Sequence, residues 1–467
     1  MFLPIRFFSS RFFTTSFKKG SFLPYSPLLM SLSKEIQDYV KINLENTHIV
    51  GVQHLLPTTY NLFGDVLCNR FSLKPYQCWL AGKCYSTDPE TRHYLALSGM
   101  HVLPHTMPRY YGKYYEEAML PDIDALWVAF SKNYSGGPII IMDDGGDLII
   151  RMPAALKEKS LHRVIALEQT TNGIMKLEKI KVLQGELPCP VINVARSGAK
   201  SLESPLIAVT IIDRLREMAL FQNKNLKCGI IGRGFIGKAV LTALKKMGYV
   251  KIYVHENNIN QRILNGVIYT ERIEDLFTAC DIILGCTAED PFLTTDIEVL
   301  LNNLKHPLTL VSCSSGDTQF GSILRYIQTQ HKEEVSDIMA DIVYGENQYL
   351  KILQGGFPIN FTRNGLCDPE ELFSFTRGLL MAGVINAYEL LILLMHIGNN
   401  QQIIENDFIQ LSPGLQKITI AQWIHHSPYA KKMYGNLNVE ALVQRSEGII
   451  FPFMWDNIEN NSVPSPR

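Results

Sequence analysis

The stretch Gly232-Arg-Gly-Phe-Ile-Gly237 decides the fold of the central part of this chain. The apolar segment 226–231 before it is typical of a buried strand, and the apolar spacing over 238–247 predicts a helix. Residues 250–254 form a second predicted strand, and Glu256 follows it, 24 positions after Gly232. Glycines permit a tight turn close to a pyrophosphate, the helix N-terminus supplies N–H donors, and a carboxylate binds ribose hydroxyls. The order therefore predicts a dinucleotide site, and an acid rather than an arginine favours NAD over NADP.

The composition excludes several classes of protein. The chain has 467 residues, enough for two or three domains, and 46% hydrophobic residues, enough for a large core. A net charge of −1 indicates neither a nucleic-acid partner nor an anionic membrane. The nine cysteines show no CxxC or CxxxC spacing and their number is odd. We therefore expect a reducing compartment, no disulfide framework and no metal site.

One segment resembles a targeting sequence, and another resembles a membrane-spanning helix. The first 34 residues are basic, rich in Phe and Ser, and free of acids until Glu35, as in a transit peptide. A disordered extension, or translation from Met30, is the simpler explanation, so we expect a cytoplasmic protein, or a mitochondrial one if the leader is a transit peptide. Leu379–Ile397 is nearly long enough to span a bilayer, but three polar or ionisable residues interrupt it, which predicts a buried helix instead.

The chain is expected to divide around the dinucleotide unit. Further strands are predicted over 137–142, 281–284 and 307–311, and helices over 211–221 and 368–394. Alternating strands and helices predict an α/β fold of two doubly wound, Rossmann-type domains with parallel sheets, and a long C-terminal helix that returns to the first domain. The expected divisions are a disordered extension (1–34), a substrate-binding-like domain (35–210), an NAD-binding domain (211–360) and the returning helix with its tail (361–467).

Seven segments resemble, in order, the S-adenosylhomocysteine hydrolase family. Ile141-Met-Asp-Asp-Gly-Gly-Asp-Leu148 resembles a strand and turn of that family, and Glu168-Gln-Thr-Thr-Asn-Gly173 is similar to its Glu-Glu-Thr-Thr-Thr-Gly. The resemblance spans roughly residues 45–420 and identifies the chain as a divergent member. The remaining segments are Gly51-Val-Gln-His54, Tyr85-Ser-Thr87, Pro190-Val-Ile-Asn-Val194, Ala199-Lys-Ser201 and Phe357-Pro-Ile-Asn360.

The resemblance implies a chemistry and the residues that carry it. Family members use tightly held NAD to oxidise a ribose 3′-hydroxyl, eliminate homocysteine and add water, which requires acid–base groups around the ribose. By resemblance, Asp144 and Lys200 match the catalytic carboxylate and lysine, and His54 matches a histidine near the reaction centre. The residues expected to contact NAD are Gly232, Gly234, Phe235, Ile236, Gly237, Glu256, Thr170, Thr171, Thr287 and Asn360.

The departures from the family pattern lie on the substrate side. Gln169 replaces a glutamate, and Ser204 and Pro205 replace an aspartate and an asparagine. Three interpretations stay open: an NAD-binding protein with altered or lost hydrolase chemistry, an active adenosylhomocysteinase of one-carbon metabolism, or a non-catalytic NAD-binding subunit. The expected partners are a nucleoside-like small molecule and either further copies of the chain or another family member.

Overall fold

The computed structural model describes residues 26–105, 115–159, 163–257, 266–287, 289–331, 334–345, 349–361, 370–397 and 405–456. Contacts divide the chain into two compact units, each of which is described by itself. The central unit is formed chiefly by Glu203–Asp368, and the flanking unit by Lys19–His105, Leu120–Leu202 and Pro369–Arg467.

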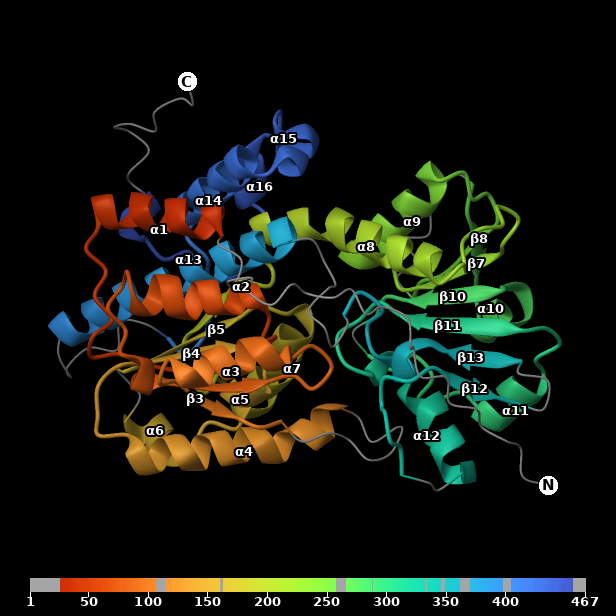
Figure 1. Cartoon of the computed structure of the whole chain (residues 1–467), viewed down its shortest axis with the longest axis horizontal. Helices are drawn as coiled ribbons and strands as arrows, with labels where there is room; N and C mark the ends of the chain where they lie inside the picture. The colour runs from red at the N-terminus through yellow and green to blue at the C-terminus, as the bar shows by residue number, and fades with distance from the viewer. Residues whose placement is uncertain are drawn as a thin grey trace. The chain divides into compact units, whose positions relative to one another are not determined.

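The flanking unit is built on a parallel sheet with seven strands among the described residues, in the order β14-β6-β5-β4-β1-β2-β3. This is the 3-2-1-4-5-6 order of a doubly wound sheet with one strand added, and the winding direction reverses between β1 and β4. Figure 1 labels β5, β4 and β3 of this sheet. The strands are β1 (His48–Gln53), β2 (Cys78–Gly82), β3 (His101–Leu103), β4 (Ile139–Asp143), β5 (Val164–Glu168), β6 (Val191–Asn193) and β14 (Phe408–Gln410).

Helices accompany this sheet from both ends of the chain. The main ones are α1 (Pro27–Tyr39), α3 (Pro89–Leu97), α4 (Tyr115–Asn133), α7 (Thr171–Gln184), α13 (Glu370–Ile397) and α14 (Pro413–His426). Shorter helices are α2 (Pro57–Tyr60), α5 (Asp147–Ile150), α6 (Ala154–Lys159), α15 (Pro428–Tyr434) and α16 (Val439–Val443). Single turns of 3₁₀ helix lie at Pro75–Gln77 and Ala199–Glu203, and a π-helical segment lies at Asn61–Cys68.

The central unit repeats the same winding. Its described strands follow the order β12-β13-β11-β10-β7-β8-β9, and all neighbours are parallel except the antiparallel pair β12 and β13. The winding reverses between β7 and β10. The strands are β7 (Cys228–Ile231), β8 (Ile252–His255), β9 (Ile268–Thr270), β10 (Ile282–Gly285), β11 (Leu308–Ser312), β12 (Ile342–Tyr344) and β13 (Leu350–Ile352). The expected α/β class with two Rossmann-type units is confirmed.

Successive side chains of the central strands point to opposite faces of that sheet, and helices cover both faces. Ile230 packs with apolar residues of α8 and α9, whereas its neighbour Ile231 packs with residues of α10, α11 and α12. Such alternation follows from the two-residue period of a strand, and a strand buried on both faces is apolar throughout. The helices are α8 (Ser204–Glu217), α9 (Phe235–Lys246), α10 (Glu274–Ala279), α11 (Ile297–Asn302) and α12 (Gly321–His331), with 3₁₀ turns at Thr318–Phe320 and Leu353–Gly356.

Two helix boundaries differ from the expectation. Residues 27–34 were expected in a disordered leader but belong to α1, whose Leu29 and Leu32 are completely buried. Ser26 caps this helix, since its hydroxyl accepts a hydrogen bond from the Leu29 N–H. Helix α8 begins at Ser204 instead of residue 211, because Pro205 in its first turn needs no hydrogen-bond partner for a backbone N–H. The rest of the leader expectation, residues 1–25, lies outside the described residues.

Helix α13 is the apolar segment that invited the membrane interpretation. By length and composition alone, Glu371–His396 could cross a membrane, and it is the one such helix among the described residues. Most of its apolar window is buried inside the protein, where α13 contacts β4, β5 and β6. This packing agrees with the prediction that the segment is a buried helix.

Glu389 on α13 predicts a pH dependence of stability. Burial, together with the negative charge of Asp456, raises the pKa of this carboxyl to about 8 from an ordinary value of 4.5. The unfolded chain therefore releases the proton first, and stability falls as the pH rises from 4.5 towards 8. We expect Glu389→Gln to raise the free energy of unfolding by a few kcal/mol, on the order of 3, above the folded pKa, with no gain below the ordinary value.

Urea unfolding of both proteins across this pH range measures the effect. Asp38→Asn removes an exposed carboxylate from α1 and serves as the matched control, which is expected to change stability little at any pH. A gain for Glu389→Gln that did not grow with pH would contradict the prediction.

Candidate functional site

The glycine turn of the central unit lies where the winding of its sheet reverses. Gly232 follows β7 with φ of +85°, a left-handed conformation that favours glycine, and α9 begins three residues later. Ligands of doubly wound sheets bind beyond the carboxyl ends of the strands at this reversal. The turn therefore presents the N-terminus of α9 at the position where such sheets bind a phosphate group.

The three glycines of the motif have different surroundings. A Cβ atom on Gly237 would lie 2.1 Å from the carbonyl oxygen of Gly232, so this glycine lets the helix pack on the turn. A Cβ atom on Gly234 would meet no atom within 4 Å, and the φ of −67° there suits any residue. Since the backbone itself does not require Gly234, its missing side chain leaves open space for a close approach of pyrophosphate.

Glu256 lies next to the turn, as a ribose-binding acid must. It follows β8, and its Oε2 accepts a hydrogen bond of 2.7 Å from the backbone N–H of Arg233. The carboxylate is thus tied to the glycine turn, at the position where a ribose hydroxyl would bind. These residues fit NAD, which carries free ribose hydroxyls, and the acid would repel the 2′-phosphate of NADP.

The remaining cofactor residues predicted in the central unit also lie near carboxyl ends of strands. Thr287 follows β10, and its N–H donates to the Oε1 of Gln319 at 2.8 Å. A Cβ atom on Gly232 would lie 2.6 Å from the Thr287 side chain, so the two positions touch. Asn360 is buried in the turn after β13, next to Ile359, whose N–H donates to the carbonyl of Ser312 at the end of β11.

In the flanking unit, two predicted residues come together where the winding of its sheet reverses. His54 follows β1 and Asp144 follows β4, and the His54 Nε2 lies 3.2 Å from the Asp144 Oδ2. A carboxylate only accepts, so Nε2 carries the hydrogen, and the opposite ring atom Nδ1 accepts from the hydroxyl of Ser86. Lys83, which follows β2, donates to the other Asp144 oxygen, and the Gln169 amide donates to Oδ2.

Burial and these partners determine the protonation states of the cluster. Burial lowers the pKa of His54 to about 4, even though Asp144 opposes this shift. Burial alone would raise the pKa of Asp144, but the charges and hydrogen bonds of Lys83 and His54 together hold it well below its usual range. Burial would lower the pKa of Lys83, but Asp144, assisted by Tyr85 and Glu168, raises the pKa of that ammonium group. At neutral pH the cluster therefore holds a carboxylate, an ammonium group and a neutral imidazole.

Glu168 shapes the turn that carries Asp144. Its carboxylate accepts hydrogen bonds from the Gly146 N–H at 2.9 Å and the Thr170 N–H at 2.7 Å. Burial, and then the charge of Asp144, raise the pKa of Glu168 to about 7. Thr170, expected to contact NAD, also donates its hydroxyl hydrogen to Glu168 and caps α7, while Thr171 is exposed in the first turn of α7.

Arg377 on α13 holds the backbone at His54. This buried guanidinium donates to the His54 carbonyl and to the Thr59 hydroxyl, each at 2.9 Å, and to the Gln53 side chain at 2.9 Å. The C-terminal helix thus fixes the turn after β1, and the position of His54 depends on a segment more than 300 residues away in sequence.

Sequence reasoning chose a different lysine for this cluster. Lys200 lies half-buried on the 3₁₀ turn Ala199–Glu203 after β6, whereas the ammonium group bound to Asp144 belongs to Lys83. Lys83 and Ser86 were not predicted as site residues. The available signal was a lysine directly after the apolar strand segment Cys78–Gly82, since polar residues at strand ends of a doubly wound sheet face the ligand site.

These features define the class of the protein. The strand order, the glycine turn and the acid after β8 are those of an NAD-binding Rossmann protein, and they support the expected cofactor. The roles of the individual site residues stay predictions.

The chain was compared with protein-family models, curated proteins and solved structures. No protein-family model matches it. Two curated relatives, the uncharacterized proteins Rv0104 and MT0113 of Mycobacterium tuberculosis strains H37Rv and CDC 1551, are each 27% identical over 356 residues. The match covers 74% of this chain and 65% of either relative, so the chain spans less than two thirds of their length.

The solved structures are similar over most of the chain at low identity. A D-isomer specific 2-hydroxyacid dehydrogenase from Lactobacillus delbrueckii ssp. bulgaricus, in its NAD complexed form, is 12% identical with a TM-score of 0.34, covering 76% of this chain and 100% of that one. A glyoxylate reductase from Paecilomyes thermophila is 12% identical with a TM-score of 0.31, covering 64% of this chain and 92% of that one.

The assignment to the S-adenosylhomocysteine hydrolase family is wrong. The structures found are dehydrogenases and reductases, and the curated relatives are uncharacterized. The segments that suggested the family are mostly strand ends and turns, for example Asp143–Asp147 after β4, and doubly wound sheets generally place Gly, Asp and Thr there. Hydrolase chemistry and a role in one-carbon metabolism have no support in these findings.

Proposed function

We propose that this protein is an NAD-dependent oxidoreductase that acts on a carbon–oxygen bond, with His54 as the proton-transfer group. The observation that carries the proposal is the neutral imidazole of His54, held between the Asp144 carboxylate and the Ser86 hydroxyl at the sheet reversal of a protein with a dinucleotide turn. When bound, NAD supplies a hydride acceptor. Oxidation of an alcohol also releases a proton, which requires a base.

The cluster has the parts that such a base needs. The Nδ1 atom of His54 is an acceptor in the resting state, so a proton from a substrate hydroxyl is taken up there, either directly or through Ser86. The resulting imidazolium lies beside the Asp144 carboxylate, whose negative charge stabilises it. Lys83 keeps that carboxylate ionised and in place.

The charges of the cluster favour a neutral substrate over a carboxylate. Recognition of a substrate carboxylate usually requires a cation that is available to it. Lys83 is engaged by Asp144, and Arg377 donates to Gln53, the His54 carbonyl and Thr59. We therefore propose secondary alcohols or their ketones as the substrate class, in contrast to the 2-hydroxy acids named for the dehydrogenases above.

The test compares NADH formation by the wild type and by His54→Gln. A panel of neutral secondary alcohols and 2-hydroxy acids is offered with NAD, and nicotinamide absorbance measures turnover. We expect a neutral alcohol to be oxidised, with the rate falling about 10²–10⁴-fold in His54→Gln. NAD affinity by calorimetry is expected to stay within about twofold, because His54 belongs to the flanking unit.

The outcomes separate the parts of the proposal. Turnover that is equal in the variant would remove His54 from the reaction. Turnover of 2-hydroxy acids alone would reject the neutral substrate class. Tight NAD binding without turnover of any panel member would favour a non-catalytic NAD-binding protein.

A further inference from the structure

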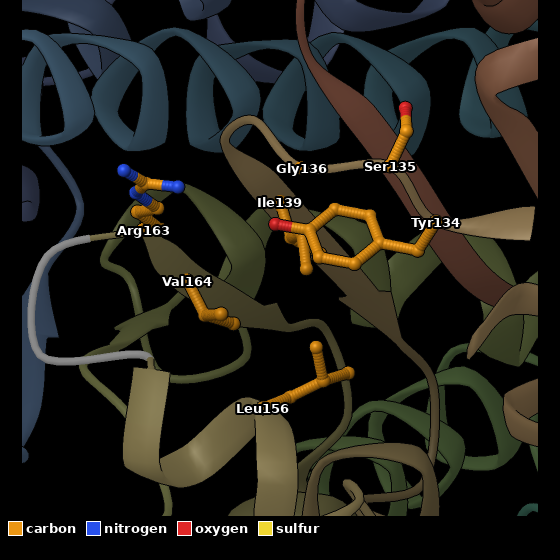
Figure 2. A pocket seen from close by; sticks show the side chains of 7 residues that line it. All are labelled: Tyr134, Ser135, Gly136, Ile139, Leu156, Arg163 and Val164. Carbon is orange, nitrogen blue, oxygen red and sulfur yellow. The ribbon is translucent and has the colours of Figure 1, made fainter.

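The flanking unit contains a cavity at the amino ends of its strands, whereas His54 and Asp144 follow the carboxyl ends of theirs. It encloses about 290 Å³ and is lined in part by Ile139 and Val164, the first residues of β4 and β5 (Figure 2). Asp143 ends β4 four residues after Ile139, so the two ends of this strand lie about 13 Å apart at roughly 3.3 Å per residue. The cavity is therefore separate from the candidate functional site.

Apolar atoms form the larger part of the cavity lining. Ile139, Leu156 and Val164 are buried apolar residues, and the ring of Tyr134 forms another wall. The Tyr134 hydroxyl donates to the carbonyl of Gly137 at 2.6 Å, which fixes the ring in place. A volume near 290 Å³ equals roughly ten water molecules and lies at the lower end of the range for small-molecule sites.

One positive charge borders these walls. Arg163 directly precedes β5 and lines the cavity, and Figure 2 shows its guanidinium group on the side toward which the Tyr134 hydroxyl points. Among the described residues, no carboxylate forms an ion pair with Arg163, whereas Arg151 in the same unit is paired with Asp124. The positive charge of Arg163 is therefore not neutralised by the described part of the flanking unit.

We propose that this cavity binds a small organic carboxylate with a flat apolar body, of about the size of benzoate. The apolar walls accept the body, and the Arg163 guanidinium binds the carboxylate in a bidentate, charge-assisted arrangement. Neither the glycine turn nor the His54 cluster takes part, so the site is independent of the proposed oxidoreductase reaction.

The test measures binding of benzoate, benzamide and inorganic phosphate to the full chain by calorimetry and ligand-observed NMR. We expect benzoate to bind with a dissociation constant of about 1 mM or tighter, and benzamide at least about tenfold more weakly because it lacks the charge. Inorganic phosphate, which has no apolar body, is not expected to displace benzoate. Equal binding of benzamide, displacement by phosphate, or no benzoate binding would each overturn the proposal.

Three variants locate the binding. Arg163→Gln is expected to weaken benzoate binding about tenfold or more, whereas the matched control Arg151→Gln leaves it unchanged. Leu156 lines the cavity and points toward Ile139 and Tyr134 in Figure 2, so Leu156→Trp fills the space between them and is expected to abolish binding in the folded protein. Binding that survives both Arg163→Gln and Leu156→Trp would place benzoate elsewhere and overturn the proposal.

Discussion

We expect the Lys83→Met variant to lose about 3–5 kcal/mol of the free energy of unfolding, because methionine leaves the Asp144 carboxylate buried without its cation. Lys83 and Asp144 are both nearly inaccessible, with side-chain exposures of 4% and 1%. Two neutral donors, Gln169 and His54, remain at the carboxylate but do not balance its charge. Urea unfolding near neutral pH measures the loss.

Two further variants separate this effect from a general loss of lysine. Adding Asp144→Asn to Lys83→Met removes the stranded charge and is expected to recover at least about half of the lost stability. Lys74→Met breaks an exposed pair with Glu45, where the two side chains are 42% and 50% accessible, and is expected to lose less than about 1 kcal/mol. A Lys83→Met loss no larger than that of Lys74→Met would contradict the prediction.

The glycine turn supplies the second large effect. Gly234→Ala is expected to weaken NAD binding about tenfold or more while leaving the melting temperature nearly unchanged, since its methyl group enters the space where pyrophosphate approaches. Gly237→Ala is expected to lower the melting temperature even without NAD, because its methyl group would lie 2.1 Å from the Gly232 carbonyl oxygen. Calorimetry and thermal unfolding measure the two effects separately.

The contrast between the two glycines is the decisive part of this experiment. A Gly234→Ala protein that melts normally and binds NAD as tightly as the wild type would show that the cofactor does not approach the turn. Equal effects of both substitutions on melting would show that Gly234 has a role in folding that its open surroundings do not explain.

Local signals explain why the central unit could be predicted from sequence. The predicted strand 281–284 is β10 at Ile282–Gly285, and the predicted strand 307–311 is β11 at Leu308–Ser312. Turn glycines, an apolar strand and helical spacing lie within one short segment there, so neighbouring residues alone determine the structure. Helix α13 was predicted for the same reason, since its apolar run is long and uninterrupted by proline.

The candidate site in the flanking unit could be predicted only in part, because its contacts depend on strand order. His54 and Asp144 were both predicted, and the structure brings them together because β1 pairs with β4. Lys83 joins them only because β2 is the other neighbour of β1, a pairing that sequence spacing does not reveal. Short motifs at strand ends likewise suggested the wrong family. Self-association and cellular location stay predictions.

The flanking unit is formed by three separate segments of the chain, and this order affects how the chain folds during synthesis. The central unit is nearly continuous and emerges from the ribosome as one piece, so it can complete its sheet while the chain is still growing. β14 can pair with β6, and Arg377 can bind the His54 carbonyl, only once residues in the last quarter of the given sequence have been made. Until then β6 lacks its β14 neighbour, and we expect newly made chains to be most prone to aggregation during this interval.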